Sequence, residues 1–404
     1  MTKAEIQKKI TGIRHHIHMH PELALEEHET SDYIASILEE LGLEVTRGIG
    51  GTGVVATLTA GTGGKMIGLR ADMDALPIAE QNDLPYKSVY PGKMHGCGHD
   101  SHVASLIGAA MLLKEDPSFN GTAVFIFQPG EEPGVGAKAM IEDGFFEKFP
   151  ISEIYGQHNN PLEPLGKITV CPSVAASSED DFWITIHGLG GHASAPQNTR
   201  DPLVTAAEIV MQLQTIVSRN LNPLSAGTVS CCDIQTDGVM NAIPSTVTIL
   251  GDCRSYDPAV QETIEKRMRE IVKHVCEMNG CGWELRYDHV FIPMVNDPTC
   301  VQAVVDAAAS LYGAERVDSA VPPLSGSEDF AWFQRRVPGA YFRVGTRPEG
   351  STQVYPQHNA CYNFNDDAIL IASEVFATII RNRLKCVYKR QNKKRALLRL
   401  SFLV

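Results

Sequence analysis

The stretch Met66-Ile67-Gly68-Leu69-Arg70-Ala71-Asp72-Met73-Asp74 passes from an apolar run to a polar, acidic cluster. Its first half is typical of a buried strand, and the charged residues follow that strand directly. Three more segments repeat the form: residues 128–132 follow the apolar run 123–127, residues 157–160 follow 154–156, and residues 345–347 follow 340–344, with His358 a little further on. Ligand sites in open α/β sheets lie at the carboxyl ends of the strands. We therefore expect these distant segments to meet at one edge of a sheet.

Helical patterns alternate with these strands, at residues 30–42, 103–113 and 301–312. This alternation predicts an α/β fold with a mainly parallel, mixed sheet and helices on both faces. Residues 180–290 have a different order of predicted elements. Strands are expected at 181–187, 228–235, 246–252 and 283–287, and helices at 202–218 and 258–277. The order β-α-β-β-α-β predicts a ferredoxin-like α+β unit, whose ends lie close enough together for insertion into another domain.

These patterns predict three parts: residues 1–179 with 291–385 as one catalytic domain, residues 180–290 as an inserted domain, and residues 386–404 as a basic tail outside the fold. Residues 381–404 hold nine Lys/Arg and no Asp/Glu, which leaves 26 basic against 48 acidic residues, a charge of about −22, in the rest. A body this acidic is a poor partner for nucleic acid or an anionic membrane. A nucleic-acid-binding role for the tail is an alternative.

The overall composition, with 43% hydrophobic and 21% charged residues among 404, is that of an ordinary globular protein. No apolar run approaches the roughly 18–20 residues of a membrane span, and the first residues do not have the pattern of a signal peptide. Ten cysteines occur without a paired CxxC framework, which favours reduced thiols and a cytoplasmic location.

The segment Met94-His95-Gly96-Cys97-Gly98-His99-Asp100-Ser101-His102 precedes a helical pattern. Cys97 and His99 stand two apart on a glycine-rich turn, so both side chains can reach one centre. A thiolate and an imidazole are good ligands for zinc and similar ions. Taken alone, a buried cysteine near a surface histidine is the commoner explanation.

Glu131 and Glu132 are adjacent in Gln128-Pro129-Gly130-Glu131-Glu132-Pro133-Gly134. Adjacent side chains point in different directions, so one carboxylate can bind a metal while the other faces a metal-bound water. Hydrolysis needs both a ligand and a general base of tuned pKa. The alternative is a solvated acidic pair, although Gly130 and Pro133 favour a fixed turn.

Three residues of the 180–290 segment are candidates for contact with a substrate. His192 lies in a glycine-rich turn after a strand, and Asn241 and Arg254 lie further along. An arginine at a strand end suits a bidentate grip on a carboxylate. A turn histidine and a surface salt bridge are the plain alternatives.

Taken together, these segments resemble the M20 family of metallopeptidases, close to its amidohydrolase branch of hippurate hydrolases, N-acyl-amino-acid hydrolases and plant indoleacetyl-amino-acid hydrolases. The resemblance covers about residues 10–383 and rests on six ordered motifs: residues 70–77, 94–102, 128–136, 187–196 and 325–330, and the segment around His358. It implies a zinc-exopeptidase-like catalytic domain with an inserted lid and dimerisation domain.

The resemblance also implies roles for individual residues. Two divalent ions (Zn, Mn, Co or Ni) would be held by Cys97, His99, Glu132, His158 and His358, with Cys97 bridging. Asp74 would orient a ligand histidine, and Glu131 would be the general acid and base. His192 would help to stabilise the oxyanion in an active site, in dimeric relatives that of the partner subunit. Asn241 and Arg254 would lie near the substrate.

The implied activity is hydrolysis of N-acyl amino acids to a carboxylic acid and a free amino acid, through a metal-bridging water and Glu131. A dipeptidase or carboxypeptidase with the same site is the nearest alternative. The bridging cysteine, where peptidase branches have Asp, favours the amidohydrolase. A non-catalytic binding protein is a further alternative, disfavoured by the intact ligand set. We expect a small-molecule partner and a homodimer through residues 180–290, and neither nucleic acid nor membrane.

Overall fold

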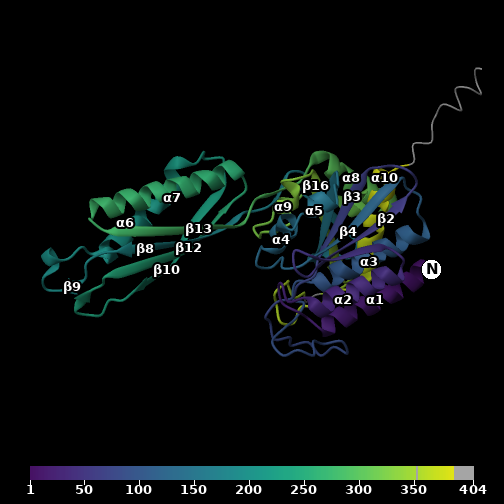
Figure 1. Ribbon diagram of the computed structural model, residues 1–404, viewed down its shortest axis with the longest axis horizontal. Helices are drawn as coiled ribbons and strands as arrows, with labels where there is room; N and C mark the ends of the chain where they lie inside the picture. Colours follow the sequence, from purple (N-terminus) through teal and green to yellow (C-terminus); the bar gives the residue numbers. More distant parts are fainter. Residues whose placement is uncertain (352–353, 386–404) are drawn as a thin grey trace, which may run out of the picture.

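Two β-sheets organise the chain in the computed structural model, which describes residues 1–351 and 354–385 (Figure 1). The larger sheet has eight strands in the order β1 (Glu44–Ile49), β2 (Gly53–Ala60), β4 (Gly121–Gln128), β3 (Met66–Asp72), β5 (Glu153–Pro164), β16 (Gly339–Arg347), β6 (Ile168–Val170), β15 (Val317–Asp318). Its central strands β4, β3, β5 and β16 are parallel to one another, whereas β1–β2, β2–β4 and β16–β6 are antiparallel pairs. The predicted mainly parallel mixed sheet is confirmed. The predicted basic tail, residues 386–404, lies outside the described residues.

Helices cover both faces of the large sheet, as predicted. One face packs against α1 (Lys3–Met19), α2 (His28–Glu40), α3 (His99–Glu115), α8 (Pro298–Tyr312) and α10 (Asp367–Arg383). The other carries the short helices α4 (Gly136–Glu142), α5 (Phe145–Lys148) and α9 (Ala331–Gln334). In α3, every residue from His99 to Leu113 is buried, so this helix lies at the centre of the core. Its N-terminus is therefore held rigidly at the edge of the sheet.

Asp-Pro pairs explain where several helices begin. Asp297 caps α8 and accepts hydrogen bonds from two backbone N–H groups, and Pro298 stands at the first helical position. Asp201 begins α6 (Pro202–Thr215) in the same way, and Asp257 begins α7 (Pro258–Met278) with a hydrogen bond from one N–H group, again with proline at the first helical position. A capping carboxylate followed by proline is a strong start signal, because proline lacks only an N–H that would be unpaired there.

The smaller sheet has four antiparallel strands in the order β10 (Gly227–Thr236), β12 (Thr246–Ser255), β8 (Glu179–His187), β13 (Gly282–Phe291). It shares a separate hydrophobic core with α6 and α7. The π-helical turn η2 (Ile216–Asn220) continues α6, where a longer α-helix was predicted. A two-stranded ribbon, β9 (Gly191–His192) with β11 (Ala242–Ile243), lies at the end far from the large sheet (Figure 1).

The chain enters the smaller sheet through β8 and leaves it through the neighbouring β13. Beside these two crossings, β7 (Val174–Ala176) pairs with β14 (Met294–Val295). Strand β10 is one of the two edge strands of the smaller sheet, and most of its residues are exposed or partly exposed. Among the described residues, none of the helices combines the length and apolarity needed to cross a membrane.

Candidate functional site

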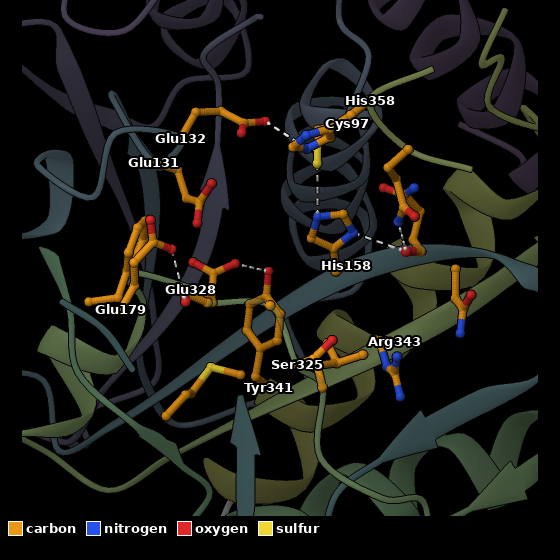
Figure 2. A pocket seen from close by; sticks show the side chains of 18 of the residues that line it. Cys97, Glu131, Glu132, His158, Glu179, Ser325, Glu328, Tyr341, Arg343 and His358 are labelled. Carbon is orange, nitrogen blue, oxygen red and sulfur yellow. Dashed lines mark hydrogen bonds and ion pairs between the residues drawn. The ribbon is translucent and has the colours of Figure 1, made fainter. Parts of the chain in front are cut away.

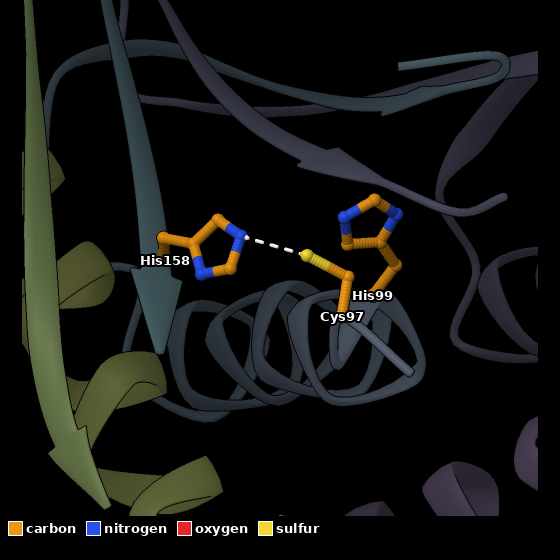
Figure 3. Close-up of side chains that lie close together, drawn as sticks. All are labelled: Cys97, His99 and His158. Carbon is orange, nitrogen blue, oxygen red and sulfur yellow. Dashed lines mark hydrogen bonds between the residues drawn. The ribbon is translucent and has the colours of Figure 1, made fainter. Parts of the chain in front are cut away.

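Five side chains from four separate segments of the sequence meet at the carboxyl edge of the large sheet (Figures 2 and 3). Cys97 Sγ lies 3.4 Å from His158 Nε2. Glu132 Oε1 lies 3.6 Å from His358 Nε2 and 3.9 Å from His99 Nε2. The structure therefore brings together all five of the metal ligands expected from the sequence.

Glycine at position 98 makes this meeting possible. Gly98 caps α3 with φ of 96°, in the left-handed region that a side chain disfavours. A Cβ atom there would lie 2.7 Å from Asn159 Oδ1. The resulting tight turn places Cys97 and His99 on either side of the helix N-terminus, where both side chains face the strand ends.

The chemistry of the five residues fits a pair of divalent ions. Two groups of three ligand atoms, from Cys97, His99 and His158 and from Cys97, Glu132 and His358, each lie within 4.8 Å of one another. Glu132 Oε1 and His99 Nε2 are buried without a hydrogen-bond partner among the described residues, which is costly unless a cation is bound. A thiolate, imidazoles and a carboxylate suit zinc, manganese, cobalt or nickel.

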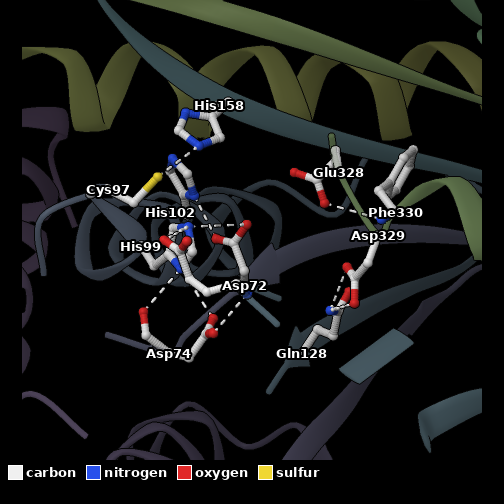
Figure 4. A network of polar contacts seen from close by, with 12 residues as sticks. Asp72, Asp74, Cys97, His99, His102, Gln128, His158, Glu328, Asp329 and Phe330 are labelled. Atoms are coloured by element: carbon white, nitrogen blue, oxygen red, sulfur yellow. Dashed lines mark hydrogen bonds and ion pairs between the residues drawn. The ribbon is translucent and has the colours of Figure 1, made fainter. Parts of the chain in front are cut away.

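Hydrogen bonds hold the ligand histidines in orientation (Figure 4). His99 Nδ1 lies 2.9 Å from the carbonyl oxygen of Asp74 and 3.1 Å from its Oδ1. His158 Nδ1 lies 2.9 Å from the carbonyl oxygen of Asn159. With Nδ1 as the donor, Nε2 of both rings presents a lone pair to the centre. Burial lowers the pKa of His158 well below its usual value, which keeps that ring neutral, as a ligand must be.

Glu131 lies beside the ligands and is itself buried, with 7% of its surface exposed. One of its carboxylate oxygens lies within 4.8 Å of the ligand atoms of His99 and Glu132. Burial raises the pKa of Glu131 well above its ordinary value, and the neighbouring Glu328 and Asp329 raise it further. Burial also raises the pKa of Glu132, to about 7. A carboxylate with a raised pKa accepts a proton readily, as a general base requires.

The turn that carries Glu131 and Glu132 is fixed by backbone hydrogen bonds. The carbonyl of Gly130 accepts from Gly136 N–H at 2.9 Å, and the carbonyl of Glu131 accepts from Gly134 N–H at 2.7 Å. The N–H of Glu132 donates to Asp74 Oδ2 at 3.0 Å. Asp74 thus contacts both His99 and this turn, which fixes the position of His99 relative to Glu131 and Glu132.

A buried charge network lies next to the metal ligands, and Figure 4 shows three of its carboxylates, those of Asp72, Glu328 and Asp329. Carboxylate oxygens of Glu328 and Asp329 lie within 4.8 Å of one from Glu131. Arg70 is fully buried, and its guanidinium donates to Asp72 at 2.7 Å, Glu328 at 3.0 Å and Asp329 at 2.9 Å. Tyr341 in turn donates to Glu328. A buried arginine surrounded by carboxylates is stable only as a complete network. This network holds the negatively charged carboxylates of Glu328 and Asp329, which lie near Glu131, in fixed positions.

A cavity of about 620 Å³ opens onto the ligands and has walls from both sheets. Arg254 lines it, as the sequence predicts, but its guanidinium is already paired. Nη1 lies 2.6 Å from Glu179 Oε2, and Nε donates to Asp252 at 2.9 Å. Nη1 also donates to Ser327 Oγ at 2.8 Å, so Arg254 connects the smaller sheet to the loop before α9.

His192 and Asn241 are not brought to this cavity within one chain. His192 belongs to β9 and Asn241 directly precedes β11, in the ribbon at the far end of the smaller sheet (Figure 1). His192 is exposed, and its Nδ1 lies 2.8 Å from the hydroxyl of Ser194. The Asn241 carbonyl accepts from the N–H of Ala193 at 3.0 Å. These contacts fix the shape of the ribbon.

Several cavity residues were not anticipated from the sequence. Tyr341 and Arg343 line the cavity from β16, and Glu179 lines it from the start of β8. In β16 the residues Tyr341 and Arg343 stand two apart and so share one face of the strand. The strand is otherwise mostly apolar and glycine-rich, so the sequence around these two residues has no local motif that marks them as part of a site.

Comparisons with known proteins identify the family of this chain. A model of peptidase family M20/M25/M40 matches residues 68–382. A hippurate hydrolase of Campylobacter jejuni is 37% identical over 94% of this chain and 98% of its own length. The thermostable carboxypeptidase 1 of Saccharolobus solfataricus is 36% identical over 93% of this chain and 95% of its own.

Among solved structures, the YXEP protein of Bacillus subtilis, described as a dinuclear metal-binding peptidase of the M20 family, superposes with a TM-score of 0.81. It is 32% identical, and the match covers 94% of this chain and 99% of that one. The family match, the two relatives and this structure all extend over most of the chain. The chain therefore belongs to peptidase family M20/M25/M40 and is a hydrolase.

Proposed function

We propose that this protein is a metal-dependent amidohydrolase that cleaves N-acyl amino acids to a carboxylic acid and a free amino acid. The observation that carries the proposal is the position of Glu131, within 4.8 Å of ligand atoms of His99 and Glu132 and on the wall of the cavity. A general base next to a metal centre is the minimum that hydrolysis of an amide requires. The similarity to a hippurate hydrolase, an enzyme named for an N-acyl amino acid, supports the substrate class.

Cys97, His99, Glu132, His158 and His358 would hold two divalent ions, with Cys97 shared between them. When bound, these ions polarise the acyl carbonyl and lower the pKa of a water molecule. The similarity to a dinuclear metal-binding peptidase supports the number of ions. Through its three contacts, Asp74 would hold His99 and the turn of Glu132 in the positions that ion binding requires.

Glu131 performs the proton transfers. It takes a proton from the attacking water, whose oxygen forms a bond to the acyl carbon. It then gives this proton to the amide nitrogen as the carbon–nitrogen bond breaks and the amino acid leaves. Because one carboxyl group serves both steps, the pKa of Glu131 must lie near the working pH, and its burial moves it in that direction.

Residues 180–290 would act as a lid and a dimerisation domain. His192 lies outside the cavity of its own chain, and the exposed edge strand β10 offers unpaired backbone groups to a second copy. In such a homodimer the ribbon of β9 and β11 would bring His192 and Asn241 to the partner's substrate. His192 would then donate to the oxyanion, a contribution of roughly 3–4 kcal/mol for one donor.

A dipeptidase or carboxypeptidase is the second candidate, because one relative is named a thermostable carboxypeptidase. The two functions differ in the acyl group, which is a simple acid in one case and an amino acid or a peptide in the other. Cys97 as the ligand shared by both ions resembles the amidohydrolase branch of the family, and so favours the hydrolysis of N-acyl amino acids.

A substrate panel tests the proposal. Purified protein is freed of metal, loaded with zinc, manganese, cobalt or nickel, and assayed with hippurate, N-acetyl amino acids, dipeptides and a carboxypeptidase substrate. We expect the highest kcat/KM on an N-acyl amino acid, with no turnover before metal is added. Preference for dipeptides would support the second candidate. Absence of turnover with every metal and substrate would contradict both.

A further inference from the structure

Two arginines line the cavity, and their charges are in different situations. Arg254 faces Glu179 Oε2 at 2.6 Å and Asp252 Oδ1 at 2.9 Å. Two carboxylates therefore already balance its charge. A substrate carboxylate that approached Arg254 would have to displace one of them or share the guanidinium with both.

Arg343 has no such partner in the part of the chain that the structure describes. Within residues 1–351 and 354–385, its guanidinium makes neither a hydrogen bond nor an ion pair, although the side chain is only partly exposed. Among the described residues whose charge acts on Arg343, Glu163 is the one carboxylate, and its Oε2 already lies 3.1 Å from Lys167 Nζ. Burial lowers the pKa of Arg343. A partly buried cation without a counter-ion loses hydration without compensation, so an anion that binds there is favoured.

The position of Arg343 relates it directly to the metal ligands. In the sheet, Arg343 of β16 lies opposite His158 of β5 and Thr169 of β6. Residues that are paired across adjacent strands point to the same face, and their strands lie about 4.8 Å apart. The hydroxyl of Thr169 is buried without a hydrogen-bond partner among the described residues. Across these three strands, the metal ligand His158, the guanidinium of Arg343 and the hydroxyl of Thr169 therefore lie side by side. The last two are unpaired among the described residues.

The remaining charges of the cavity direct an anion to this side. Figure 2 shows Arg343 on the side of His158, with Glu179 and Glu328 across the cavity. Glu328 is held by Arg70 and Tyr341, and Glu179 by Arg254. A carboxylate would be repelled by the acidic wall and attracted to Arg343.

We propose that Arg343, which lies next to the metal ligand His158, binds a carboxylate of the substrate. This contact would make the enzyme specific for substrates with a carboxylate at that position. This inference rests on the proposed function and names a residue and a charge requirement within it. The carboxylate has two possible sources: the α-carboxylate of the amino acid, or a second carboxylate at the end of a dicarboxylic acyl group. Both present the same chemistry to the guanidinium.

Two matched substrate pairs distinguish the sources. The first pair is N-acetyl-L-alanine and N-acetyl-L-alaninamide, which differ in the α-carboxylate. The second is N-succinyl-L-alanine and N-butyryl-L-alanine, which differ in the terminal carboxylate of the acyl group. The ratio of kcat/KM between charged and neutral members is measured in the metal-loaded wild type, Arg343→Met, Arg343→Lys and the control Arg335→Met, an exposed arginine outside the cavity.

In Arg343→Met we expect the ratio to fall about 10- to 100-fold in one of the two pairs, mainly through KM. The pair affected identifies the source of the carboxylate. Arg343→Lys keeps the positive charge but lacks the two parallel donors of arginine, so it should retain part of the preference for the charged substrate. This variant also provides the test if Arg343→Met does not fold. Arg335→Met should match the wild type. Ratios within twofold of the wild type in both pairs would overturn the proposal.

Binding without turnover separates this proposal from the proposed function. Calorimetry with the same four compounds is done on metal-loaded Glu131→Gln, with and without Arg343→Met. Weaker binding of a charged compound to the double variant supports Arg343 even if the wild type cleaves none of the four, which would contradict the function alone. Equal binding by both proteins contradicts the role of Arg343, whatever the turnover.

Discussion

The Sγ atom of Cys97 lies 3.4 Å from Nε2 of His158, although the two residues are 61 positions apart. The left-handed turn at Gly98 brings the thiol to the N-terminus of α3, and β5 carries the imidazole to the same edge of the sheet. Ligand atoms of Glu132 and His358 also lie within 4.8 Å of this sulfur atom. One sulfur atom therefore lies between two sets of ligands, which is the arrangement expected of a bridging thiolate.

Substitution of Glu131 by Gln should abolish the proton transfers and leave the metal centre intact. We expect kcat to fall about 10²- to 10⁴-fold, the usual contribution of general acid–base catalysis. Metal content, measured by mass spectrometry of the purified protein, should be that of the wild type. Glu142→Gln, an exposed residue of the following helix, is the control. Near-normal turnover in Glu131→Gln would remove Glu131 from its proposed role.

Asp74→Asn should weaken metal binding without direct loss of a ligand. The change removes the negative charge that accepts from His99 Nδ1 at 3.1 Å and from the N–H of Glu132 at 3.0 Å. Loss of such a supporting carboxylate lowers metal affinity about 10- to 100-fold. A zinc titration against a competing chelator measures the change. The exposed Asp83→Asn is the control, and equal affinities in the two variants would contradict the role of Asp74.

If His192 acts in the partner's active site, two inactive variants should complement each other. His192→Ala and Glu131→Gln each lack one group that both active sites need. In a random mixture of dimers, about a quarter of the wild-type activity should return, because half of the dimers are mixed and each has one complete site. The assay compares the mixture, after subunit exchange, with each variant alone. No recovery despite demonstrated mixed dimers would show that His192 does not act between subunits.

Glu153 should make the stability of the large sheet depend on pH. Burial acts to raise its pKa, but hydrogen bonds from Arg383, Lys65 and Tyr155 outweigh burial and lower the pKa to about 2. A folded-state pKa below that of the unfolded chain stabilises the fold above about pH 4.3, and this contribution disappears as the pH falls toward 2.

Glu153→Gln should therefore lower the free energy of unfolding by about 1–3 kcal/mol at pH 7, and by progressively less between pH 5 and pH 3. Urea unfolding at several pH values measures the difference from the wild type. Glu147→Gln removes an exposed carboxylate 3.9 Å from Arg336 and should have almost no effect. A pH-independent loss of stability in Glu153→Gln would contradict the ionic origin.

The fold was predictable where apolar patterns are long. The strands and helices of residues 180–290 and the helix stripe at residues 103–113 lie close to where the sequence placed them. Strand β5 was underestimated, because its second half carries His158, Asn159 and Asn160, which line a site and not a core. The ribbon of β9 and β11 is too short for any periodic signal. Helix α1 was missed, although Thr2 and Glu5 form a capping box at its start.

The site was predictable where its residues occur in recognisable motifs, as do Cys97, His99 and Glu132. The residues that were missed belong to strands and loops whose polar members have no local signature. Arg343 is one polar residue in an apolar strand, and its importance comes from the neighbouring strand that places His158 beside it. The pairing of Arg254 with Glu179 was equally hidden, since 75 residues separate them and only the fold brings them into contact.

The central claim is that Cys97, His99, Glu132, His158 and His358 hold two ions in common. Anomalous X-ray diffraction at the zinc edge, on crystals of the zinc-loaded protein, tests it most directly. We predict two anomalous peaks per chain, both within coordinating distance of Cys97 Sγ and each completed by ligands from this set, at about 2.0–2.3 Å. A single peak elsewhere, or ions that leave Cys97 and His358 without contact, would contradict the account.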